Sequence, residues 1–78
     1  MDVMTTTDAL AELKVLRRRE PFVPFVIVLN DGRRLPVNRR MQYAFQEWQG
    51  VVLDEQDWIS RFKPADIVAI EIAVPASN

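Results

Sequence analysis

An Asp-Gly pair flanked by two strand-forming segments limits the folds open to this chain. Asp31 and Gly32 can supply the positive φ angles of a tight hairpin turn. The segment before them, 25–29, contains only aromatic, β-branched and leucine residues, which suit strands. We therefore expect an antiparallel hairpin whose strands are 25–29 and 34–37.

The first hairpin strand is apolar on both faces. Strand alternation places Phe25, Ile27 and Leu29 on one side and Val26 and Val28 on the other. A strand that is apolar on both sides is typical of one covered on both. We expect other elements to cover both faces of this strand.

The return strand contains a proline. Pro36 has no N–H to give to a ladder, so this strand should lie at a sheet edge or bend there. The segment 38–49 that follows is the least regular part of the sequence, and we expect one helical turn around 39–43. Three more strands are predicted at 50–53, 58–62 and 67–73, with a polar turn at 54–57 and a short 3₁₀ turn at 63–66.

One amphipathic helix precedes the strands. Apolar residues recur every three or four positions between Ala9 and Leu16, and a helix should end before Pro21. The predicted helix spans 7–19 and is capped by Thr5 or Thr7, with 1–6 as a flexible tail.

These elements predict a single, mostly β domain over 1–78. An N-terminal α-helix precedes a five-stranded antiparallel sheet over 22–74, strongly bent or closed as a small barrel of the Sm-like or SH3-like kind. Closure would remove the exposed edges of the apolar strands.

The composition excludes several kinds of chemistry. The 78 residues include no cysteine and no histidine, which excludes disulfides, the usual zinc sites and Ser-His or Cys-His nucleophiles. Gly32 and Gly50 lie too far apart to form one phosphate-binding loop. We therefore expect a non-enzymatic protein without metal or cofactor. So short a chain buries a modest core, which favours self-association as an added source of stability.

Charge is divided unevenly along the chain. Residues 1–40 hold eight basic and five acidic groups, a balance of +3, and residues 41–78 hold two and six, a balance of −4. The N-terminal segment lacks the charge order of a secretory signal, and no apolar run approaches the length of a membrane span. We expect a cytoplasmic protein without membrane contact.

Two segments resemble the halves of the Sm motif. They are 26–35, Val-Ile-Val-Leu-Asn-Asp-Gly-Arg-Arg-Leu, and 59–68, Ile-Ser-Arg-Phe-Lys-Pro-Ala-Asp-Ile-Val. In this order after a helix they resemble the Sm-like barrel of the Hfq-like group, which implies a ring-forming fold and RNA binding. The chain is also similar to short bacterial proteins with a Pro-Phe-x-Pro-Phe pattern before Asp-Gly-Arg. Hfq-like proteins carry a Lys-His pair in the turn before the last strand, whereas Lys63 is followed here by Pro64.

Two functions from different classes follow from these residues. The first is a module that binds itself or a protein partner through exposed aromatic residues, with Tyr43, Phe45 and Trp48 as interface candidates. Trp58 is expected to fill the interior, and both placements are open for Trp48. The alternative is single-stranded RNA binding by a face formed of Arg17, Arg18, Arg33, Arg34, Arg39 and Arg40. Against it, the arginines at 17–19 would also be favoured by the helix dipole alone.

Overall fold

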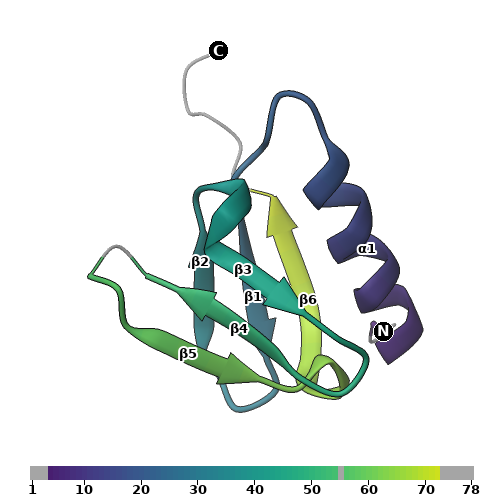
Figure 1. Cartoon of the computed structure of the whole chain (residues 1–78). Coiled ribbons are helices and arrows are strands. Elements are labelled where there is room, and N and C mark those ends of the chain that lie inside the picture. The colour runs from purple at the N-terminus through teal and green to yellow at the C-terminus, as the bar shows by residue number, and fades with distance from the viewer. Residues whose placement is uncertain (1–3, 55, 73–78) are drawn as a thin grey trace.

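The computed structural model describes residues 4–54 and 56–72. Within them, the helix α1 (Thr6–Arg18) precedes six strands and two 3₁₀ helices, which confirms a mostly β chain with a leading helix (Figure 1). The strands are β1 (Phe25–Leu29), β2 (Arg34–Val37), β3 (Tyr43–Phe45), β4 (Gly50–Leu53), β5 (Ile59–Phe62) and β6 (Ile67–Ile72). The 3₁₀ helices are η1 (Arg40–Gln42) and η2 (Pro64–Asp66), as expected near 39–43 and 63–66.

The strands form two antiparallel sheets instead of one five-stranded sheet. Their orders are β2-β1-β6 and β3-β4-β5, and no ladder joins the two sheets within residues 4–54 and 56–72. The predicted five strands and closed barrel are therefore wrong in this respect. The additional strand is β3, which the sequence interpretation left inside an irregular segment.

The break between β2 and β3 has a local cause at Gln42. Its side-chain oxygen accepts hydrogen bonds from the backbone N–H groups of Asn38 and Arg39, at 2.7 and 2.8 Å. Its amide nitrogen donates to the carbonyl of Leu53 at 2.9 Å. One side chain thus satisfies backbone donors that a continuous strand would give to a ladder, and the chain turns there.

The two hairpin strands form as predicted, but of Asp31 and Gly32 only Gly32 has a positive φ. Gly32 has a φ of +92°, and the Leu29 N–H donates to the Arg33 carbonyl at 2.9 Å. The pairs from Phe25–Val37 to Val28–Arg34 follow in register. This turn fixes which residues of β1 face the core.

The helix begins one residue earlier than predicted. The Thr5 hydroxyl accepts from the Asp8 N–H at 3.1 Å, which identifies Thr5 as the N-cap. Met4 packs against the core, so Met4 to Thr6 belong to the folded part and not to a tail. The other residues of the predicted tail, 1–3, lie outside the described residues.

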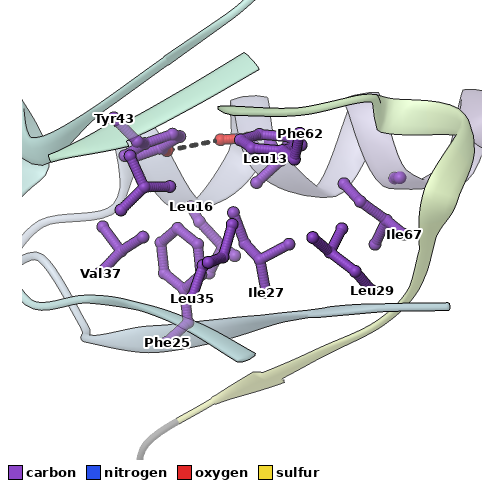
Figure 2. Close-up of a cluster of buried hydrophobic side chains, with 12 residues drawn as sticks. Leu13, Leu16, Phe25, Ile27, Leu29, Leu35, Val37, Tyr43, Phe62 and Ile67 are labelled. Atoms are coloured by element: carbon purple, nitrogen blue, oxygen red, sulfur yellow. Dashed lines mark hydrogen bonds between the residues drawn. The ribbon is translucent and has the colours of Figure 1, made fainter. Parts of the chain in front are cut away.

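The core lies between the two sheets and under α1. Figure 2 shows side chains from β1 and α1 pointing toward one another with Phe62 and Tyr43 above them. Burying these apolar side chains is the main source of stability in a chain with no cross-link. The buried residues are Ala9, Leu13, Leu16, Phe25, Ile27, Leu29, Leu35, Val37, Tyr43, Val52, Phe62 and Ile67.

The second face of β1 is not covered as expected. Val26 and Val28 are only half-buried, and each pairs with residues of β2 and β6. Arg34 pairs with Val28 and Glu71 with Val26, and their side chains form an ion pair that crosses this face. The long charged side chains cover apolar surface here, so the valines need no second layer.

Candidate interaction surfaces

Arg17 is a structural residue at the boundary of the core. Its guanidinium donates to the carbonyl of Tyr43 at 3.0 Å. The same group lies 5.0 Å from the centre of the Tyr43 ring and 4.9 Å from that of Phe45. These two rings stack with centres 5.9 Å apart. Arg17, predicted to contact nucleic acid, therefore packs within the chain against Tyr43 and Phe45, which were predicted to form an interface.

Tyr43 is the most buried of these groups. Its ring meets Phe25 edge-on at 5.3 Å, and its hydroxyl donates to the Leu13 carbonyl at 2.9 Å (Figure 2). Burial raises the pKa of the phenol, against the opposing charge of Arg17. Tyr43 thus stays neutral and structural.

Arg40 has a similar structural role at the end of the helix. It donates to the carbonyls of Arg17 and Arg19 at 2.9 and 2.7 Å, which satisfies acceptors at the C-terminus of α1. It also pairs with Glu20 at 3.1 Å and lies 5.7 Å from the ring centre of Phe22. Its donors are largely used within the chain.

The two hairpin arginines have acidic partners. Arg33 pairs with Asp31 at 3.0 Å, and Arg34 pairs with Glu71. Hydrogen bonds from the Arg33 backbone and side chain hold the pKa of Asp31 below its ordinary value. Both ion pairs are exposed to solvent, so they contribute little stability.

The six predicted arginines do not form one free surface. Arg18 and Arg39 are exposed and have no ion pair within the described residues. Arg17 and Arg40 lie at the C-terminal end of α1, whereas the hairpin that carries Arg33 and Arg34 is at the opposite end of the molecule (Figure 1). The arginine face expected from the sequence is therefore divided.

A cleft beside Trp48 is lined by a set of basic residues that differs from the predicted one. Trp48 is 77% exposed and lies with Arg33, Arg61 and Lys63 around a hollow of about 360 Å³, which Asp66 also lines. Trp48 and Arg33 were candidates from the sequence, but Arg61 and Lys63 were missed. Strand alternation was the available signal, since it turns Arg61 away from the buried Phe62.

Two of the four outer strand edges are blocked. Along β2, the backbone N–H groups point alternately toward β1 and away from it. The hydrogen bond between Leu29 and Arg33 sets this alternation, so the N–H at position 36 would point away from β1. Pro36 has no N–H to offer a further strand there. At the edge of β3, the Tyr43 carbonyl is occupied by Arg17. Neither edge can extend a sheet without losing these features.

Among the described residues, the outer edges of β5 and β6 carry neither a proline nor an occupied carbonyl, but α1 packs beside the edge of β6 (Figure 1). The Asp54 N–H donates to the Trp58 carbonyl at 3.0 Å, so alternation turns the N–H groups of Ile59 and Arg61 away from β4. Trp58 and Ile59 are 69% and 62% exposed. The prediction that Trp58 fills the interior is therefore wrong, because Trp58 is exposed in the turn directly before β5.

A groove runs between α1 and the edge of β6. It has a volume of about 570 Å³, and the exposed Val15 of α1 is at its side. Its acidic members are on the helix and its strand members are apolar. The lining residues are Met4, Asp8, Ala11, Glu12, Val15, Val68, Ala69 and Ile70.

Comparison with protein-family models, curated proteins and solved structures yields no match. The resemblance to Sm-like proteins therefore stays a prediction. Among residues 4–54 and 56–72, the helix is too short to cross a membrane.

Proposed function

We propose that this chain is a non-enzymatic module that associates with copies of itself by strand pairing. The observation that supports this function is the contrast between its edges, since β2 carries Pro36 and β3 an occupied carbonyl, whereas β5 has neither and β6 is separated from α1 by a groove. Natural β proteins protect edges that must stay single, because an open edge is a template for another strand. Ile59 of β5 and Trp58 directly before it are also exposed.

The two open edges belong to different sheets. β5 is the outer strand of one sheet and β6 of the other; in Figure 1 β5 lies at the lower margin of the molecule, whereas β6 lies between β1 and α1. Pairing β5 of one copy with β6 of the next leaves a free edge at each end. Such head-to-tail contacts build a ring if they close and a filament if they do not.

The first test is the mass of the full chain by light scattering after size exclusion, over a range of concentrations. A mass of several chains that rises with concentration is expected. A single-chain mass at every concentration would refute self-association.

A proline at the β5 edge tests the route. Arg61→Pro removes an N–H that faces away from β4 and so costs no bond of the existing ladder. We expect Arg61→Pro to be a monomer with the circular dichroism of the wild type. Arg61→Ala is the matched control, because it removes the same charge and keeps the N–H. Equal association of both variants would show that β5 does not pair.

A second candidate function, single-stranded RNA binding, is favoured by the Trp48 cleft. An exposed indole beside Arg33, Arg61 and Lys63 offers stacking and phosphate contacts together. If RNA binds in this cleft, its affinity should fall steeply as the salt concentration rises, because the release of counterions from the phosphates drives such binding.

Fluorescence anisotropy with a labelled oligouridylate at low and high salt tests this candidate. Lys63→Glu should abolish binding, and Arg18→Glu, an equal charge change away from the cleft, should not. Absence of binding at low salt, or equal loss in both variants, would count against the cleft as a nucleic-acid site.

A further inference from the structure

Asp66 brings a carboxylate to the basic Trp48 cleft. It is half-buried at the end of η2, between β5 and β6. Its backbone N–H donates to the Lys63 carbonyl at 2.8 Å, and its carbonyl accepts from the Asn30 N–H at 2.9 Å. Both backbone groups are used within the chain, so the carboxylate is the polar group that Asp66 offers to the cleft.

This carboxylate has no ion pair within residues 4–54 and 56–72, although three cations line the same cleft. Arg33 pairs with Asp31 instead, and Arg61 and Lys63 have no acidic partner among the described residues. Phosphate binding alone gives Asp66 no role, because two negative charges repel each other. A carboxylate beside an exposed indole favours a ligand that also donates hydrogen bonds.

The nucleobases differ in what they offer to a carboxylate, which accepts hydrogen bonds through two oxygens. The Watson–Crick edge of guanine carries two adjacent donors, N1–H and the N2 amino group, and these match the two oxygens. The N3–H of uracil lies between two carbonyl oxygens, and adenine and cytosine each present one amino group beside an acceptor nitrogen. These acceptors would face a carboxylate oxygen and repel it, so guanine is the base that a carboxylate selects.

We infer that the Trp48 cleft binds a guanine base of single-stranded RNA and that Asp66 selects this base. The inference rests on the second candidate function, RNA binding at this cleft, and names the base that is recognised. Trp48 stacks on the guanine, Arg61 and Lys63 contact the phosphates, and the Asp66 carboxylate accepts from N1–H and the N2 amino group. The volume of about 360 Å³ is at the lower end of the range for ligand pockets and suits one nucleotide.

Fluorescence anisotropy at low salt tests the inference with labelled oligouridylates that differ only in one central base. The strand with guanosine should bind about tenfold more tightly than the strand with adenosine. Inosine lacks the N2 amino group and should lose most of this preference.

Asp66→Asn should abolish the preference for guanosine, because it replaces one acceptor oxygen with a donor. It should not weaken binding of the strand that contains only uridine, since it removes a negative charge from the cleft. Asp57→Asn is the matched control. Asp57 is exposed and lies outside the cleft, and asparagine tolerates its positive φ of 66°.

Tryptophan emission locates the bound strand. The chain has two tryptophans, so Trp58→Phe leaves Trp48 as the sole one. Its emission should be quenched by the guanosine strand at the concentrations at which the anisotropy rises. Binding without quenching would overturn the inference, because the base would then lie away from Trp48.

The outcomes separate this inference from RNA binding itself. Absence of binding by every strand at low salt would overturn both. Equal affinity for the guanosine and adenosine strands, or the same preference in Asp66→Asn and Asp57→Asn, would overturn the selection of guanine and leave RNA binding standing. Circular dichroism of each variant shows whether a lost preference reflects lost folding.

Discussion

The hydroxyl of Tyr43 donates a 2.9 Å hydrogen bond to the backbone carbonyl of Leu13, joining the first residue of β3 to the middle of α1 (Figure 2). The same helix returns a bond in the opposite direction, from Arg17 to the Tyr43 carbonyl. Two hydrogen bonds, one in each direction, thus attach α1 to the β3-β4-β5 sheet, although β1 and β2 lie between α1 and β3 in the sequence. Tyr43 is a structural residue for this reason.

Removing the Tyr43 hydroxyl should destabilise the chain without changing its fold. Tyr43→Phe keeps the ring contacts with Phe25 and Phe45 but deletes the bond to Leu13. We expect a loss of about 1 kcal/mol in the free energy of unfolding, measured with urea. Met41→Ala, at an exposed position, should change it by less than about 0.5 kcal/mol. Equal effects of the two would contradict the role of the bond.

The same phenol predicts a loss of stability at high pH. Burial raises the pKa of Tyr43 above its ordinary value of 10.0, so the folded state holds the proton more tightly than the unfolded state. Well below pH 10 the contribution of this group to stability is fully present and does not change with pH; it is lost as pH rises through 10 toward the folded-state pKa. Tyr43 is the only tyrosine, so phenolate absorbance reports it directly. Tyr43→Phe should show a weaker decline of unfolding free energy above pH 10.

The features that were predicted correctly depend only on residues adjacent in the chain. Asp31-Gly32 specifies a tight turn whatever surrounds it, and Pro64 begins the expected 3₁₀ helix. β3 was missed because it is three residues long and follows a turn fixed by a side chain, that of Gln42. Residue propensities do not predict that a side chain will accept the hydrogen bonds that a neighbouring strand would otherwise accept.

The roles of the arginines depended on tertiary packing. Arg17 was grouped with Arg18 as a surface cation, although it lies four residues after Leu13 and so on the buried stripe of the helix. That spacing was a usable signal. No local pattern showed that Arg40 would meet the carbonyls of Arg17 and Arg19. The Trp48 cleft brings together three segments, and single-sequence reasoning could not place them together.

The contrast between neighbouring arginines gives a third prediction. Arg17→Ala removes a hydrogen bond to Tyr43 and two contacts with aromatic faces, so it should lower the free energy of unfolding by about 1–2 kcal/mol. Arg18→Ala, one residue away and exposed, should change it by no more than about 0.5 kcal/mol. The measurement is urea unfolding followed by circular dichroism. If both variants lost the same stability, the loss would come from helix charge and not from the contacts of Arg17.

Gly50 gives the last prediction, since its lack of a side chain lets a ring pack against the backbone. A Cβ at Gly50 would lie only 2.2 Å from Cζ of Phe62, which is buried. Gly50→Ala should therefore destabilise the chain by about 1–3 kcal/mol through overpacking, even though alanine suits a strand no worse than glycine does. Combining it with Phe62→Leu should cost less than the sum of the two single changes, because the smaller side chain makes room for the methyl group. Additive losses in the double-mutant cycle, measured by urea unfolding, would show that the two residues are not in contact.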